Sequence, residues 1–89
     1  MPEIKVVVRN KVGLHARPAA MFVKTANQYT SNIQVVNGAK AANAKSILSV
    51  LTLGAGQGAE IILRADGEDS EAALQALREL VEDNFGEEG

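Results

Sequence analysis

Short segments with the apolar patterns of strands and helices follow one another along this chain, and their order constrains the fold more than any other feature. Three segments have the β-branched or alternating pattern of strands: residues 4–9, 33–41 and 60–65. Two segments repeat apolar residues every three or four positions, as amphipathic helices do: residues 15–26 and 70–81. A further helix of about two turns is predicted from Ser46 to Leu53, because a serine begins this apolar stretch and Gly54 follows it.

Turn and cap residues refine this order. Asn37-Gly38 is a strong hairpin signal, so residues 33–41 are expected to form two antiparallel strands. Pro18 suits the first turn of a helix, where a backbone N–H would have no partner. The last helix is expected to begin near Asp69 or Ser70, with a side-chain oxygen as its cap. The predicted order is β-α-β-β-α-β-α, a two-layer α+β domain with helices on one face of an antiparallel sheet.

The length and composition indicate a single domain without covalent cross-links. The 89 residues fit one domain, residues 1–89, and residues 86–89 are expected to fray at its end. The absence of cysteine excludes disulfides, thiolate metal sites and thiol nucleophiles. The run Val6-Val7-Val8 ends at Arg9, far short of a secretion signal or a membrane span. The sequence therefore predicts a cytoplasmic protein that does not insert into the membrane directly.

Charge is divided unevenly along the chain. Residues 1–59 carry seven Lys or Arg and one acid, whereas residues 60–89 carry two Arg and ten acids, giving +6 and −8 within the net charge of −2. This division favours a basic surface that attracts an acidic partner or phosphate. A solvated acidic helix at the end of the chain would also explain it. Nucleic acid is not expected as a partner, because the basic residues are scattered and no aromatic stacking platform accompanies them.

His15 is the only histidine, and it lies in the run Gly13-Leu14-His15-Ala16-Arg17-Pro18-Ala19 at the expected start of the first helix. The first turn of a helix leaves backbone N–H groups unpaired, and with the helix dipole they form an anion site. Arg17 adds a guanidinium that matches phosphate oxygens. These residues predict an imidazole nucleophile beside a phosphate site, although a histidine here can also be a simple cap. A metal site is not expected, since no second histidine or cysteine could complete a ligand set.

Residues 13–19, together with Lys45-Ser46-Ile47 and Leu51-Thr52-Leu53-Gly54 downstream, resemble HPr, the phosphocarrier family of the bacterial phosphoenolpyruvate-dependent sugar phosphotransferase system. The resemblance covers essentially the whole chain. It implies an open-faced β-sandwich, in which three helices cover one face of a four-stranded antiparallel sheet. It also implies that His15 accepts a phosphoryl group on Nδ1 from phosphorylated enzyme I and donates it to IIA domains of sugar permeases. Arg17 and the backbone N–H groups of Ala16 and Arg17 would hold the transferred group.

A carrier of this kind is a reactant in a relay and not a free-standing enzyme. No cofactor is expected for it. We expect a monomer, because the site must be exposed to several partners in turn.

Ser46 is a candidate regulatory site. It is expected to cap the second helix, and a phosphate in this place would meet the positive end of the helix dipole. The resemblance implies that in Firmicutes-type relatives the matching serine is phosphorylated by an ATP-dependent HPr kinase. This modification lowers phosphotransfer at the histidine. New negative charge near the docking surface would repel an acidic partner. Possible partners therefore include HPr kinase and a transcriptional regulator.

The second helix is apolar on all sides, which predicts a docking surface. Val50 and Leu53 are expected to point inward, and three residues outward around His15: Ile47, Leu48 and Leu51. Ala20 and Lys24 of the first helix would complete the rim. Exposed apolar residues beside a reactive side chain are typical of docking sites, although a small domain could also use all five apolar residues in its core.

Val12 departs from the family pattern. Many members have Asn or Ser here, which can hydrogen-bond near the imidazole, so in this chain the ring must depend on backbone groups or water. The run Asn10-Lys11-Val12-Gly13 is also similar to nitrogen-branch paralogues of HPr, which use a different enzyme I and different IIA partners. Two other hypotheses are a regulatory module that acts through Ser46 with His15 idle, and a ferredoxin-like domain that binds a small molecule.

Overall fold

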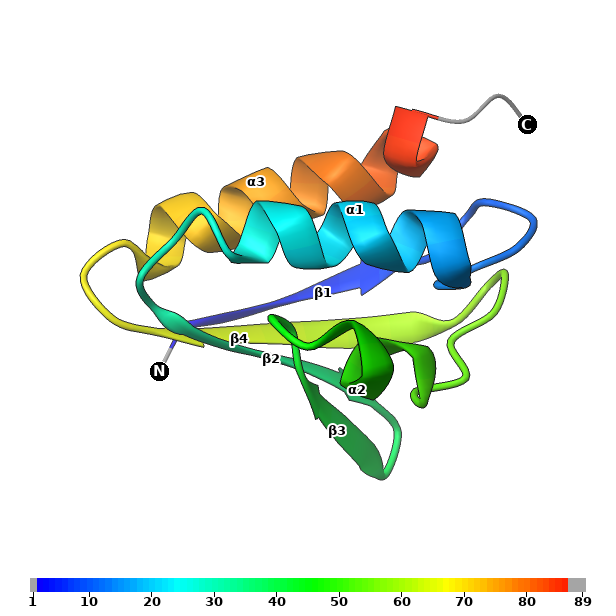
Figure 1. Ribbon diagram of the computed structural model, residues 1–89, viewed down its shortest axis with the longest axis horizontal. Helices are drawn as coiled ribbons and strands as arrows, with labels where there is room; N and C mark the ends of the chain where they lie inside the picture. The colour runs from blue at the N-terminus through cyan, green and yellow to red at the C-terminus, as the bar shows by residue number, and fades with distance from the viewer. Residues whose placement is uncertain (1, 87–89) are drawn as a thin grey trace.

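The computed structural model describes residues 2–86 and confirms the predicted order of elements. Its helices and strands are β1 (Glu3–Val7), α1 (Ala16–Ala26), β2 (Asn32–Asn37), β3 (Lys40–Asn43), α2 (Ile47–Leu51), β4 (Glu60–Asp66) and α3 (Ser70–Glu82), followed by a short 3₁₀ turn, Asn84–Gly86 (Figure 1). Of the tail expected to fray, Gly86 donates its N–H to the carbonyl of Asp83 at 3.0 Å. Residues 87–89 lie outside the described part of the chain.

The strands form one antiparallel sheet in the order β1-β4-β2-β3. Register on the covered face is fixed by apolar pairs, because a slip of one residue would turn buried side chains toward water. Val6 of β1 lies opposite Ile61 of β4, and Val35 of β2 lies opposite Leu63, all of them buried. The predicted hairpin is confirmed, with Asn37 opposite Lys40 and Gly38 at φ +62° in the turn between them.

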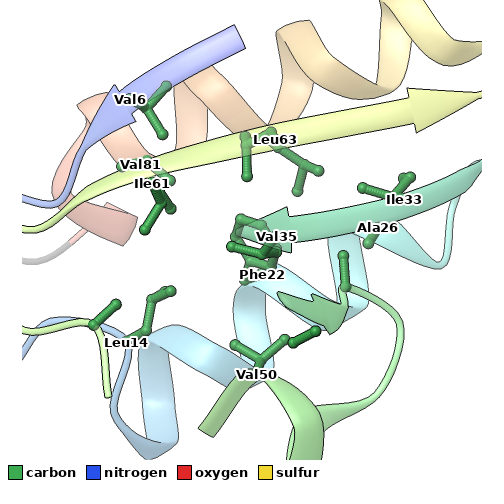
Figure 2. Packing of buried hydrophobic residues seen from close by; sticks show 14 of the residues in the cluster. Val6, Leu14, Phe22, Ala26, Ile33, Val35, Val50, Ile61, Leu63 and Val81 are labelled. Atoms are coloured by element: carbon green, nitrogen blue, oxygen red, sulfur yellow. The ribbon is translucent and has the colours of Figure 1, made fainter. Parts of the chain in front are cut away.

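All three helices lie on the same face of the sheet, which confirms the open-faced α+β architecture (Figure 1). Phe22 of α1 is fully buried in the cluster that includes Val35 and Leu63 of the sheet (Figure 2). Beyond α3, Asn84 and Phe85 both take positive φ, and Phe85 is buried at 2% exposure. The chain therefore bends sharply after α3, and this bend brings a second aromatic ring into the core.

The predicted start of α3 near Asp69 or Ser70 is confirmed, but the predicted side-chain cap is wrong, because Asp69 is the N-cap residue and its side chain makes no capping hydrogen bond. Its carboxylate instead accepts hydrogen bonds from the backbone N–H groups of Thr30 at 2.8 Å and Ser31 at 2.9 Å, and from the hydroxyl of Ser31. The Ser31 hydroxyl and the Thr30 N–H stabilise the charged form and lower the pKa of Asp69 from 3.8 to about 2. Ser70 is the first residue of α3. Asp69 thus joins the start of α3 to the segment that enters β2.

The helix α2 is shorter than predicted, because Thr52 is its C-cap. The expected inward residues are confirmed: Val50 and Leu53 are both buried. Gly54 follows with φ +66°, the left-handed conformation expected just after a helix. The side-chain amide of Asn37 donates to the carbonyl of Leu53 at 2.9 Å, so the end of α2 is attached to the β2–β3 hairpin.

Candidate functional site

His15 is the N-cap residue of α1 and is exposed to solvent. Its backbone is extended (φ −87°, ψ −170°), its carbonyl accepts the N–H of Ala19 at 2.8 Å, and its imidazole makes no capping hydrogen bond. Pro18, in the first turn as predicted, has no N–H. Of the first-turn amides, those of Ala16 and Arg17 have no partner among residues 2–86. The imidazole therefore stands at a helix end with two amides able to receive an anion.

His15 lines a hollow of about 400 Å³. Its lining brings together two predicted site residues besides His15, namely Ala16 and Leu51. The other lining residues are Val12, Leu14, Gly54, Ala55 and Gly56. The hollow thus lies between the start of α1 and the end of α2, with a floor that is mainly apolar or backbone.

The loop before α1 is attached to the loop after α2. Leu14 donates its N–H to the carbonyl of Ala55 at 2.8 Å, and Gly58 donates to the carbonyl of Val8 at 2.7 Å. Gly13 has φ +63°, and a Cβ at this position would lie 2.3 Å from the Ala55 oxygen. Only glycine permits so close an approach of the two backbones. The position of His15 therefore depends on contacts with residues about forty positions later in the chain.

The family resemblance places position 12 near the imidazole, but sequence reasoning did not predict that Ala55 and Gly56 share a hollow with Val12 and His15. Val12 is 54% exposed there. The signal that could have indicated this arrangement is Gly13, because a glycine between a strand and a helix often reflects a positive φ or a close backbone approach. The partner in that approach could not be identified from sequence.

Arg17 and Ser46 do not line the hollow. Arg17 is exposed in the first turn of α1, and its guanidinium makes no hydrogen bond within the described residues. Ser46 caps α2 as predicted, and its Oγ accepts the N–H of Ser49 at 3.4 Å. Both residues are thus at helix starts, and neither makes a hydrogen bond to His15 within residues 2–86.

Three residues of α2 form an exposed apolar group that we call the α2 patch: Ile47, Leu48 and Leu51. Leu48 is the most exposed of them at 73%. The predicted outward orientation of all three is confirmed. Ala20 and Lys24 are exposed on α1, four and eight residues after Ala16 and hence on the same side of that helix. The helices α1 and α2 contact each other, and Leu51 of the patch lines the same hollow as Ala16 at the start of α1.

No group of three or more His, Cys, Asp or Glu side chains suited to a metal ion occurs within residues 2–86. Over the same residues, every helix is too short or too polar to cross a lipid bilayer.

The fold and the site together define a class of protein: a small open-faced α+β domain that presents one exposed histidine at the start of a helix. Residues 2–83 match the family model PTS-HPr, described as the PTS HPr component phosphorylation site. The chain therefore belongs to the HPr family of phosphocarrier proteins.

Relatives and solved structures agree with this assignment. Phosphocarrier protein HPr of Xylella fastidiosa is 46% identical over 88 residues, covering 99% of both chains. The HPr-like protein Crh of Bacillus subtilis is 45% identical over 83 residues, covering 93% of this chain and 98% of Crh. The crystal structure of HPr-C-His from Thermoanaerobacter tengcongensis superposes with a TM-score of 0.97 at 48% identity, covering 100% of both chains.

Proposed function

We propose that this protein carries a phosphoryl group on Nδ1 of His15, accepted from phosphorylated enzyme I and donated to IIA domains of sugar permeases. The observation that supports this function most directly is the exposed imidazole at the N-terminus of α1, where two backbone amides have no partner within residues 2–86. Membership in the HPr family supports the same chemistry. The protein is a reactant in each transfer, and we propose that it acts as a cytoplasmic monomer.

Each transfer exchanges one bond to phosphorus for another. The lone pair on Nδ1 of His15 attacks the phosphorus held by enzyme I, the bond to the donor breaks, and a new N–P bond forms. The N–H groups of Ala16 and Arg17 and the positive end of α1 stabilise the negative oxygens of the transferred group. The guanidinium of Arg17 is one helical turn or less from this place and can reach a phosphoryl oxygen once the group is present. In donation, a nucleophilic side chain of the IIA domain attacks the phosphorus, a bond to that acceptor forms, and the N–P bond to His15 breaks, which returns the lone pair to Nδ1.

Labelling tests this function directly. Incubation with enzyme I and phosphoenolpyruvate carrying labelled phosphate should give a modification that is labile in acid and stable in base. The variant His15→Ala should take up no label. Arg17→Ala, which keeps the nucleophile, should still be labelled but more slowly. Equal labelling of His15→Ala and the wild type would contradict the proposal.

The α2 patch and the exposed side of α1 form the proposed docking surface. Exposed apolar residues next to a reactive group are typical of transient interfaces, which bury an apolar centre inside a polar rim. The α2 patch supplies the apolar centre, and Ala20 and Lys24 lie at the rim. Enzyme I and the IIA domains are expected to use this surface one after the other, since each must reach His15.

We further propose that Ser46 is a site of regulatory phosphorylation by an HPr kinase, and that a transcriptional regulator binds the phosphorylated form. Ser46 caps the helix that carries the α2 patch, so a phosphate there would add negative charge beside the docking surface. In a kinase reaction with ATP, Ser46→Ala should lose incorporation while keeping transfer through His15. Incorporation that is unchanged in Ser46→Ala would contradict this role.

A nitrogen-branch carrier is the alternative. The exposed Val12 beside His15, in the run Asn10-Lys11-Val12-Gly13, is the observation in its favour. Transfer from the phosphorylated protein to a IIA domain of a sugar permease and to a nitrogen-branch IIA protein, measured side by side, distinguishes the two branches. Faster transfer to the sugar IIA domain is expected.

A further inference from the structure

Asn10 is a buried amide in the loop that leads to His15. Its side chain is 1% exposed, although it belongs to no helix or strand. The side-chain Nδ2 of Asn10 donates a hydrogen bond to the carbonyl of Gly13 at 2.9 Å. The backbone carbonyl of Asn10 accepts the N–H of Gly13 at 3.1 Å. One residue therefore holds Gly13 from both its side chain and its backbone.

These two bonds close the turn that contains Val12 and fix the peptide just before Leu14. Leu14 is buried, and its N–H reaches the carbonyl of Ala55 only if the preceding peptide has the orientation that the turn imposes. His15 follows directly, with an extended backbone that presents the imidazole to solvent. A chain of bonded neighbours thus leads from Asn10 through Gly13 and Leu14 to the nucleophile.

An apolar side chain would fill the interior at position 10 without the need to satisfy an amide. Burial of an amide is unfavourable unless it is hydrogen-bonded, and the Nδ2 of Asn10 makes one such bond to the loop of the site. Such a bond removes freedom from the loop before substrate arrives, which is the kind of preorganisation that group transfer requires.

We propose that Asn10 is a positioning residue for phosphoryl transfer, and that its bonds to Gly13 hold the imidazole of His15 in line with the incoming phosphorus. This inference rests on the proposed function of His15. Asn10 is not expected to touch the phosphoryl group, and its contribution is to the geometry of the loop.

The test compares Asn10→Ala with Val81→Ala, a buried substitution in α3 that destabilises the fold away from this loop. Two measurements are made under conditions where both variants are folded. The first is NMR of the imidazole resonances of His15 and hydrogen exchange of the Leu14 N–H. The second is the rate of labelling by enzyme I and phosphoenolpyruvate as the concentration of the carrier is varied.

In Asn10→Ala, the Leu14 N–H should exchange faster relative to global unfolding, and the imidazole resonances should shift. The kcat for labelling should fall by on the order of 10-fold to 100-fold. The KM should stay near the wild-type value, because the docking surface is intact. Val81→Ala should lose stability with wild-type resonances at His15 and wild-type kcat.

The outcomes decide whether Asn10 positions His15. Unchanged Leu14 exchange and imidazole resonances in Asn10→Ala would overturn the proposal, as would altered resonances with a wild-type kcat. If the wild type itself took no label, the proposed function would fail, whereas the NMR measurement would still show whether Asn10 orders the loop.

Discussion

At the scale of single residues, Gly13 has the most constrained place in the site. It combines a positive φ with a contact in which an added Cβ would lie 2.3 Å from the Ala55 oxygen and 2.6 Å from the Gly56 Cα. Gly38 has nearly the same φ, +62°, but an added Cβ would meet nothing within 4 Å. The two glycines therefore separate the effect of backbone conformation from the effect of crowding.

Gly38→Ala should lower the free energy of unfolding by about 1–2 kcal/mol, the usual effect of a side chain in the left-handed region. Gly13→Ala should lower it by at least about twice as much, because the Ala55 carbonyl cannot retreat without losing its bond with Leu14. Urea unfolding of both variants measures the difference. Equal decreases in the free energy of unfolding would show that the loop opposite Gly13 moves away from an added Cβ at no cost in stability.

At the scale of elements, Asp69 joins α3 to the entrance of β2, and its pKa predicts how this junction responds to acid. The pKa is lowered from 3.8 to about 2 in the folded protein, chiefly by the Ser31 hydroxyl and the Thr30 N–H. A group with a depressed folded pKa stabilises the fold fully above its unfolded pKa, and this stabilisation is lost as pH falls through the folded pKa. The contribution of Asp69 should therefore disappear between about pH 4 and pH 2.

Asp69→Asn should be less stable than the wild type at pH 7, and the difference should narrow over that pH range. Urea unfolding at pH 7, 4, 3 and 2 measures it. Asp83→Asn is the control, because Asp83 is exposed and its side chain makes no hydrogen bond or ion pair within residues 2–86. A gap between Asp69→Asn and the wild type that stays constant down to pH 2 would contradict the assignment.

The helix α2 provides a pair of neighbouring substitutions with opposite expected effects. Leu48→Asp changes a residue that is 73% exposed, so stability should change by no more than about 0.5 kcal/mol while the KM for enzyme I rises about 10-fold. Val50→Ala removes buried methyl groups and should lower the free energy of unfolding by about 1–3 kcal/mol with an unchanged KM. Thermal unfolding and steady-state labelling measure both. A wild-type KM for Leu48→Asp would exclude the α2 patch as the docking surface.

Elements were predicted well from sequence, and the errors have a common physical cause. Periodicity and turn residues depend on local chemistry, so the order of strands and helices, the hairpin at Gly38 and the outward face of α2 were all confirmed. The sequence offers Asp69 or Ser70 as a local cap of α3, but the Asp69 carboxylate accepts a hydrogen bond from Ser31, a residue distant in sequence. The floor of the hollow was missed for the same reason, since Ala55 meets Gly13 only through tertiary contacts. Local sequence patterns do not show whether a polar group will bond to a neighbour in sequence or to a distant residue that the fold brings close.

At the scale of the whole molecule, the surface around the site is mainly basic and the last helix is mainly acidic, with Arg78 of that helix paired to Glu82. Exposed basic residues lie in the loop before α1 and along α1: Lys11, Arg17 and Lys24. Exposed acids follow one another around and along α3: Glu68, Glu71, Glu79, Glu82 and Asp83. The field of such a molecule orients an acidic partner toward the basic residues around α1, and this effect changes the rate of encounter more than the chemistry that follows.

Raising the ionic strength should therefore weaken the approach of enzyme I while leaving the transfer step intact. Between about 10 mM and 150 mM salt the Debye length falls from about 30 Å to about 8 Å, so charges beyond the immediate contact are screened. The KM for labelling should rise over this range with little change in kcat. Lys24→Glu should raise the KM at low salt and flatten its salt dependence. Lys40→Glu makes the same change in the β2–β3 hairpin, outside the proposed docking surface, and should behave like the wild type. If both variants responded alike, net charge and not a local basic surface would govern the encounter.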